Sequence, residues 1–465
     1  GRVEMAAGEK VTLDLYGDGL LELAVDGEVE DALLENTGTI EAESGTVVMT
    51  ARAAKEAVDN VINVEGVVDA SSATMKGGKI ILSGGESGKV AVSGKLDASG
   101  ATGGDVEVTG EFVSAENGAE IDASGENGGG VIHFGGEYQG GGDTPTSDYA
   151  YIDGGAILRA NADEDGDGGE VIVWSDEATG FFGDIEAQGG ANSGDGGFVE
   201  VSSFEFLQFS GFVSTAAANG EVGTLLLDPR DFEIRLGSGD APSDGDVSTT
   251  SWINSGVLDF NDDTTGWIYE SELEAQDTDF VLRARRDLTV ANGDTGTYGG
   301  TLGDGTIELQ ANRSLTLETL NNAGNDGGID LTTSSFGSGL VFKTTGTGSI
   351  TARASFGGTR DGDIRVGGLS TENGNVTLST DEGSIFSTGV INVTGSGDVS
   401  MTSGTSGEND DIFIDGNINI TGGDFTATAG DDVRISYFTS GAEIRTNGGD
   451  VEITTLDTNS SSGEF

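Results

Sequence analysis

The stretch KLDASGATGGDVEVTG at residues 95–110 decides the fold, because it returns as EIDASGENGGGVIHFGG at residues 120–136. A degenerate third copy, DIEAQGGANSGDGGFVEVSS, occupies residues 184–203. The first two copies are offset by 25 residues, and clusters of valine and isoleucine continue at looser intervals as far as Val451. Self-similarity with a period of about 20 to 50 residues is typical of solenoids and propellers.

Each copy contains short runs in which apolar and polar residues alternate, such as Val106-Glu107-Val108. Alternation of this kind indicates a strand with one buried face. A strand of three to five residues cannot bury that face alone, but similar strands stacked coil upon coil form parallel sheets around a shared core. The repeat therefore predicts an all-β chain folded as a parallel β-helix.

The composition agrees with this fold. The chain of 465 residues holds 81 glycines, only three prolines and no cysteine. Glycine suits the corners of a coil because it adopts positive φ at little cost. A chain without cysteine has no disulfide framework and no thiolate metal site, so its stability must come from packing and backbone hydrogen bonds.

The charge balance and the lack of a long apolar run argue against two classes of partner, nucleic acid and membrane. There are 81 acidic and 21 basic residues, which gives a formal net charge of -60. Nucleic acid is not expected as a partner of so acidic a chain. No run approaches the roughly 18 apolar residues of a membrane-spanning helix, so no membrane insertion is expected. No signal peptide precedes Gly1, so we expect the chain to come from a longer or processed product.

The repeat divides the chain into a first β-helix block at 1–229, a loop-bearing connection at 230–271, a second block at 272–456 and a disordered tail at 457–465. The connection contains a weakly periodic excursion at 236–265. The segment ARAAKEAVDN places apolar residues at helical spacing and lacks glycine, which favours a short helix packed on the coils near residues 51–62.

Several segments resemble the repeats of filamentous-haemagglutinin-type exoproteins, among them GRVEMAAGEKVTL, DGLLELAVDGEV and VIVWSDEATGFFGDIEAQGG. The resemblance is closest over 1–229. It implies a right-handed parallel β-helix that is secreted and displayed on the surface of a Gram-negative-type bacterium. It also implies export through an outer-membrane two-partner secretion pore. The Asn-Pro-Asn-Gly-Ile type of motif that engages the pore does not occur here, so that partner is expected for the parent chain only.

One segment suggests a metal site. In NADEDGDGGE, residues 161–170, Asp163, Asp165 and Asp167 fit the opening of a calcium loop, since oxygen ligands at alternate positions suit Ca²⁺. The twelfth position, where a glutamate should close the coordination shell, is Trp174. The alternative is a solvated acidic turn, so Ca²⁺ is the only cofactor considered and none is required.

Aromatic and basic residues offer further candidates. Trp252 and Trp267 lie in or beside the excursion, which makes them candidate partner contacts. The phenylalanines between 181 and 212 are expected to stack in the core. His133, the only histidine, maps onto the inward-facing Val108 at an offset of 25 residues and is expected to be packed.

These observations predict a rigid β-solenoid that acts as a secreted adhesin, or as a structural protein of an extracellular filament or matrix, with no catalytic residue. Its expected partner is a cell-surface or matrix receptor, for which carbohydrate is a candidate. End-to-end or lateral self-association is also open, because uncapped coils expose strand edges. The alternative is a carbohydrate-active β-helix enzyme, a polysaccharide lyase or hydrolase with paired carboxylates.

Overall fold

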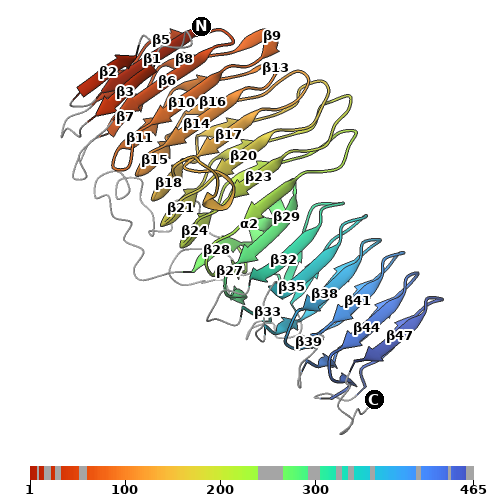
Figure 1. Ribbon diagram of the computed structural model, residues 1–465. Helices are drawn as coiled ribbons and strands as arrows, with labels where there is room; N and C mark the ends of the chain where they lie inside the picture. The colour runs from red at the N-terminus through yellow and green to blue at the C-terminus, as the bar shows by residue number, and fades with distance from the viewer. Residues whose placement is uncertain are drawn as a thin grey trace. The chain divides into compact units, whose positions relative to one another are not determined.

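The structure is a computed structural model that describes residues 1–7, 10–14, 22–26, 33–51, 60–238, 265–291, 304–320, 327–332, 340–356, 362–404, 410–437 and 441–456. These residues form two compact units, which divide between Asp228 and Pro229. In both units short strands stack in parallel, coil upon coil (Figure 1). The parallel β-helix predicted from the repeat is therefore confirmed.

The first unit contains three sheets of parallel strands, and each complete coil contributes one strand to each sheet. The first sheet contains β1 (Arg2–Ala7), β6 (Thr46–Ala51), β10 (Lys79–Ser83), β14 (Asp105–Thr109), β17 (Val131–Phe134), β20 (Glu170–Val173), β23 (Phe198–Val201) and β26 (Thr224–Leu227). The second contains β4 (Leu34–Asn36), β7 (Asn60–Val64), β11 (Lys89–Val92), β15 (Phe112–Ala115), β18 (Tyr149–Ile152), β21 (Ala178–Phe181) and β24 (Phe206–Phe209). The third contains β5 (Thr39–Glu41), β8 (Val67–Asp69), β12 (Lys95–Asp97), β16 (Glu120–Asp122), β19 (Ile157–Arg159), β22 (Asp184–Glu186) and β25 (Phe212–Ser214).

Two small pairs accompany these sheets. Strands β9 (Ser72–Lys76) and β13 (Gly100–Thr102) pair in parallel at a corner of adjacent coils. Strands β2 (Lys10–Asp14) and β3 (Glu22–Asp26) form an antiparallel pair.

The second unit repeats the three-sheet plan. Its first sheet contains β29 (Asp279–Ala284), β32 (Leu315–Leu320), β35 (Ile350–Phe356), β38 (Val376–Thr380), β41 (Val399–Thr402), β44 (Phe425–Ala429) and β47 (Val451–Thr455). Its second contains β28 (Gly266–Tyr269), β27 (Phe232–Arg235), β30 (Leu288–Ala291), β33 (Ile329–Leu331), β36 (Ile364–Val366), β39 (Ile385–Ser387), β42 (Ile412–Ile414) and β45 (Val433–Ile435). Its third contains β31 (Thr306–Glu308), β34 (Val341–Lys343), β37 (Gly368–Thr371), β40 (Ile391–Val393), β43 (Ile418–Ile420) and β46 (Ile444–Thr446).

The core of each unit consists of apolar side chains that stack in columns. In the first unit one column of the first sheet is completely or almost completely buried: Val47, Ile80, Val106, Ile132, Val171, Val199 and Leu225. In the second unit the corresponding column is Phe280, Leu315, Ile350, Val376, Val399 and Phe425. Burying such side chains stabilises each by about 1.5–3 kcal/mol relative to exposure, which drives the stacking of coils.

The double glycine of the repeat forms a tight corner. Gly104 N donates to Ala98 O at 2.9 Å, and Gly130 N donates to Ala123 O at 2.8 Å, so each corner closes within its own coil. A Cβ on Gly104 would lie 2.2 Å from Gly78 O, and one on Gly130 would lie 2.1 Å from Gly104 O. No side chain fits there. The same contact with the preceding coil recurs at Gly169, Gly197 and Gly223.

The Asp-Ala-Ser part of the repeat forms the opposite end of this corner. Asp97 Oδ1 accepts a hydrogen bond from Ser99 N at 3.0 Å, and Asp122 Oδ1 accepts one from Ser124 N at 3.0 Å. The alanine between them is buried in each copy. Aspartate favours this position because its short carboxylate bonds to the backbone two residues ahead.

Helix is scarce in the described residues, and most of the segment where the sequence predicted a short helix lies outside them. Ala51 ends β6, while Val61 lies in β7, so both ends of the expected segment are strands; residues 52–59 lie outside the described residues. The one α-helix of the described residues is α2 (Glu270–Ala275), and η1 (Tyr138–Gly140) is a 3₁₀ turn. No helix in the described part of the chain is both long and apolar enough to cross a membrane.

Candidate functional site

His133 lies on the outward face of the first sheet in the first unit, contrary to the expectation from the repeat. The prediction that His133 is packed inward over Val108 is wrong: Val108 pairs with Phe134, and His133 pairs with the outward-facing Glu107. The cause is one additional glycine in the run at 128–130, which shifts the register of β17 by one residue. A shift of one residue moves a side chain to the other face of a strand.

His133 consequently forms a polar pair on the outside of the coil. Its Nε2 lies 3.0 Å from Glu170 Oε1 in the neighbouring β20, and the two side chains are 19% and 43% exposed. An imidazole held by a carboxylate is an arrangement that can move a proton. This pair was missed by sequence reasoning, although the extra glycine was a readable signal.

A strap, defined as residues 135–148 between β17 and β18, crosses this face. Gln139 N donates to Glu200 Oε2 at 3.1 Å, and Gln139 Nε2 donates to Asp228 Oδ2 at 2.9 Å. Both acids are almost completely buried, at 0% and 1% exposure. The Tyr138 ring lies 5.8 Å from that of Phe198. The strap thus encloses two outward-facing carboxylates that an isolated sheet would expose.

A groove of about 550 Å³ lies on the corner beside the strap. Its floor is made of the corner glycines, and its acidic side chains are Glu170, Asp195 and Glu221, with the Phe198 ring as the aromatic member. The full lining is Gly129, Gly130, Val131, Gly168, Gly169, Glu170, Asp195, Gly196, Gly197, Phe198, Glu221, Val222, Gly223 and Thr224. Because glycine has no side chain, the groove exposes backbone to a ligand over four successive coils.

The structure does not bring the predicted calcium ligands together. Asp165 Oδ1 accepts a hydrogen bond from Ser193 Oγ at 2.9 Å, and Asp167 Oδ1 accepts one from Asp195 N at 2.8 Å. Asp163 is largely exposed, and partial desolvation of its carboxylate together with repulsion from Asp122 and Glu126 raises its pKa. Within the described residues these three carboxylates do not form a group of oxygens within 4.8 Å of one another. Asp165 and Asp167 instead accept hydrogen bonds from the next coil.

The two tryptophans have different outcomes. Trp252 lies outside the described residues. Trp267 lies in β28 and is only 3% exposed, with the Arg235 guanidinium 4.0 Å from its ring centroid. The expectation that Trp267 is an accessible loop aromatic is therefore wrong. The excursion ends before this residue, and the ring is covered by packing and a cation–π contact.

The phenylalanines between 181 and 212 are only partly in the core. Phe181 and Phe209 are fully buried and stack with ring centroids 5.0 Å apart, as expected for one coil above another. Phe204 and Phe212 are instead 50% and 37% exposed. Their positions at corners and strand starts, and not within the inward alternation, account for the difference.

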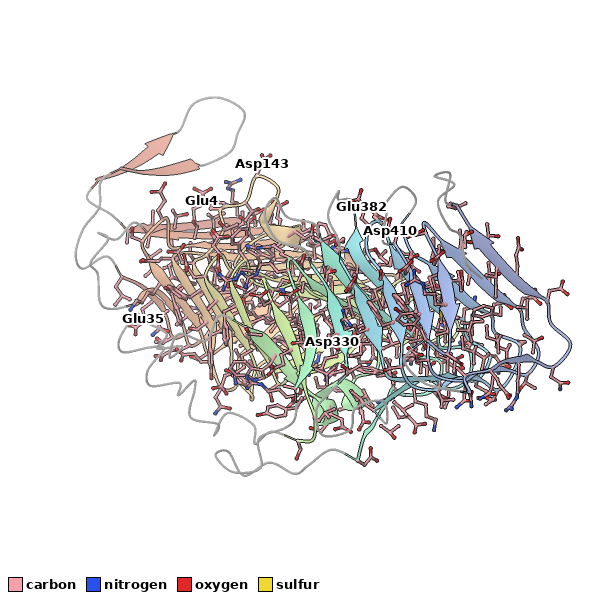
Figure 2. The ribbon with its side chains drawn as sticks, turned by 90° about the horizontal axis from the view of Figure 1, so that it is seen from below. Glu4, Glu35, Asp143, Asp330, Glu382 and Asp410 are labelled. Atoms are coloured by element: carbon pink, nitrogen blue, oxygen red, sulfur yellow. The ribbon has the colours of Figure 1, made fainter. Side chains whose placement is uncertain are left out.

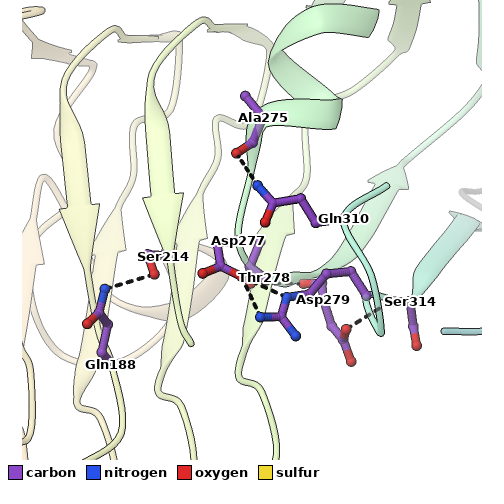
Figure 3. A network of polar contacts seen from close by, with 9 residues as sticks. Gln188, Ser214, Ala275, Asp277, Thr278, Asp279, Gln310 and Ser314 are labelled. Carbon is purple, nitrogen blue, oxygen red and sulfur yellow. Dashed lines mark hydrogen bonds and ion pairs between the residues drawn. The ribbon is translucent and has the colours of Figure 1, made fainter. Parts of the chain in front are cut away.

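Acidic side chains hold successive coils of the second unit together. Asp398 Oδ1 accepts a hydrogen bond from Asp424 N at 2.8 Å, and Asp424 Oδ1 accepts one from Asp450 N at 2.8 Å. Asp279 Oδ1 likewise accepts one from Ser314 N at 2.8 Å (Figure 3). Side chains at one place on successive coils thus cap the backbone of the coil above: Asp279, Ser314, Ser349, Asn375, Asp398 and Asp424.

Basic side chains neutralise some of this charge. Arg283 Nη2 lies 2.8 Å from Glu318 Oε2 on the neighbouring strand β32, and Arg286 Nε donates to Asp231 Oδ1 at 2.8 Å. Arg313 Nε donates a hydrogen bond to Asp277 Oδ1 at 2.9 Å. Arg283 and Arg286, at the two ends of the arginine run at 283–286, therefore both pair with neighbouring acids.

Comparisons with known proteins add no identification. No protein-family model matches the chain, and no curated protein matches it. The class that the fold defines, a parallel β-solenoid, therefore stands on the strand pairing and the repeat alone.

Proposed function

We propose that this chain is part of a secreted cell-surface adhesin or of a structural protein of an extracellular filament or matrix. The observation that carries the proposal is the ladder of side-chain caps, as at Asp398 and Asp424, which joins each coil to the next. It produces a stiff surface on which the same groups repeat from coil to coil. Repeated weak contacts on such a surface add up to strong attachment to an extended ligand.

The proposed partner is a receptor or matrix polymer of the cell exterior, with carbohydrate as the candidate class. The proposal retains an outer-membrane two-partner secretion pore as the exporter of the parent chain, and self-association of coils through their exposed edges. The residues proposed to contact a ligand are those of the groove beside the strap, with Phe198 for stacking on a sugar ring and Glu170 and Asp195 as hydrogen-bond acceptors.

The test is binding of the full chain to immobilised acidic, neutral and amino polysaccharides and to whole cells, with electron microscopy of the same sample. We expect attachment that weakens at least tenfold in Phe198→Ala and Glu170→Gln. Glu120→Gln, which changes an exposed acid of β16 in the third sheet, is the matched control and should bind normally. Absence of both attachment and assembly would remove the support for this function.

The alternative is a carbohydrate-active enzyme, and the groove favours it as well. Glu170 lies in the groove and contacts His133, so a carboxylate and an imidazole meet at one edge of a sugar-sized space. The enzyme would be established if the wild-type chain released reducing ends or unsaturated products from a polysaccharide and Glu170→Gln did not. Binding without product formation would leave the adhesin as the better account.

A further inference from the structure

Two aspartates of the second unit stack at the entrance to its second sheet. Asp411 directly precedes β42 and Asp432 directly precedes β45, and these strands pair in parallel with Ile412 opposite Val433. Asp432 N donates to Asp411 Oδ1 at 3.0 Å. The two carboxylates therefore occupy the same place on consecutive coils, where the stacking itself keeps them close.

A third carboxylate converges on this pair. Asp431 joins Asp411 and Asp432 in the one group of three acidic side chains, within the described residues, whose oxygens all lie within 4.8 Å of one another. Asp411 and Asp432 are buried, whereas Asp431 is half-buried and leaves an approach from solvent. Two oxygens that share one Ca²⁺ at about 2.4 Å can be at most about 4.8 Å apart, so this spacing is compatible with a common ion.

An independent observation points to a missing ligand. Asp432 is only 4% exposed, and its Oδ1 atom is buried without a hydrogen-bond partner. Its other oxygen, Oδ2, accepts a hydrogen bond from the Arg434 guanidinium at 2.7 Å. A buried carboxylate oxygen without a donor destabilises the fold, so a bound cation at this atom would remove that penalty.

A single arginine contacts two carboxylates of this group. Arg434 pairs with Asp432 and lies 3.5 Å from Asp411 Oδ2, while the neighbouring Asp410 is also buried at 3% exposure. Burial raises the pKa of Asp411, and repulsion from Asp432 and Asp410 adds to this effect. One guanidinium thus lies against two buried carboxylates, Asp411 and Asp432.

The surrounding backbone is built around these side chains. A Cβ on Gly404 would lie 1.9 Å from Asp410 Oδ2, and one on Gly430 would lie 2.9 Å from Asp410 Cβ. Asp410 Oδ1 accepts a hydrogen bond from Gly383 N at 2.9 Å, and Figure 2 shows Asp410 and Glu382 on the same edge of the second unit. The corner glycines therefore leave space for the side chain of Asp410, which is buried although a carboxylate is more favourably solvated by water.

We propose that Asp411, Asp431 and Asp432 bind a divalent cation with all-oxygen coordination, Ca²⁺ being the best match. The donor set contains neither nitrogen nor sulfur ligands, which selects hard cations. The half-buried position of Asp431 allows waters to complete the shell, and the larger, more flexible coordination sphere of Ca²⁺ fits three unevenly buried carboxylates better than the strict octahedron of Mg²⁺. The ion would join the coil of β42 to that of β45.

The experiment titrates calcium chloride into the full chain by calorimetry in about 0.15 M sodium chloride, which screens diffuse binding to other carboxylates. Melting temperatures are measured in calcium and in sodium chloride at equal ionic strength. Asp431→Asn and Asp432→Asn test the site, the former at a half-buried position that tolerates change. Asp424→Asn and Asp165→Asn are controls, since each removes one acidic charge from a different ladder or turn.

We expect one saturable site in the wild-type chain, a melting temperature higher in calcium than in sodium chloride, and at least tenfold weaker binding in both site variants. The controls should bind as the wild type does. Magnesium should bind more weakly than calcium. The proposal is overturned if the wild-type chain shows only diffuse binding, if the site variants titrate normally, or if Asp165→Asn removes the site instead.

Discussion

Replacing Gly130 by alanine tests the physical basis of the coil corner most directly. The new Cβ would lie 2.1 Å from Gly104 O, whereas real Cβ atoms essentially never lie within 3.0 Å of such an atom. The contact is with backbone, so no side chain can rotate away. The coil must therefore move by about 0.9 Å relative to the one before it.

A displacement of that size would stretch two backbone hydrogen bonds beyond useful length. Val131 N donates to Gly104 O at 2.9 Å, and Gly103 N donates to Gly128 O at 2.9 Å, so both bonds cross between the two coils. Each such bond contributes about 1 kcal/mol net, and forced overpacking costs about 1–3 kcal/mol. Because the two effects share one movement, we expect a loss of about 2–4 kcal/mol in the free energy of unfolding.

The assay combines urea unfolding with hydrogen exchange, since long stacks of repeats need not unfold in a single step. Amides of β17 should lose protection first in Gly130→Ala. Gly38→Ala is the matched control, because a Cβ there would meet nothing within 4 Å, and its change should stay within about 0.5 kcal/mol. Equal stability of the two variants would refute the steric account of the double glycine.

Three other predictions concern packing and charge. Trp267→Ala should lower the free energy of unfolding by about 3 kcal/mol in a urea melt, because the ring is buried. An unchanged melt would show that the ring does not contribute to the core. Burial raises the pKa of Asp411 above its ordinary value of 3.8, so the unfolded chain releases that proton first and stability falls as pH rises through the raised pKa. For Asp97 burial acts upward, but hydrogen bonds from Ser99 and Lys95 outweigh it and lower the pKa, so its contribution is present above pH 3.8 and is lost in acid. The melting temperature should therefore pass through its maximum on the acidic side of neutrality, and a maximum above neutrality would contradict this. The melting temperature should also rise between about 0.1 and 1 M sodium chloride. The reason is that the Debye length falls from about 10 Å to 3 Å, so that salt screens the repulsion between exposed acids on successive coils, such as Asp398 and Asp424. A flat response would show that these charges do not destabilise the stack.

The fold and the corner chemistry could be predicted from the sequence because they depend on local signals. Alternation at Val106-Glu107-Val108 predicts which side chains enter the core, and the recurring Asp-Ala-Ser and Gly-Gly elements repeat at every turn of the coil. Each of these signals acts within a few residues of its position. Periodicity then extends one coil to the whole stack, since similar strands pair with similar strands.

The candidate sites could not be predicted in this way, because they depend on register between coils and on what covers a face. One extra glycine turned His133 outward toward Glu170, and packing by Arg235 buried Trp267. The acid pairs at 410–411 and 431–432 looked like many others in so acidic a chain. Only stacking of their coils brought Asp431 and Asp432 to Asp411, because neighbours across coils are distant in sequence and their contact is decided by three-dimensional register.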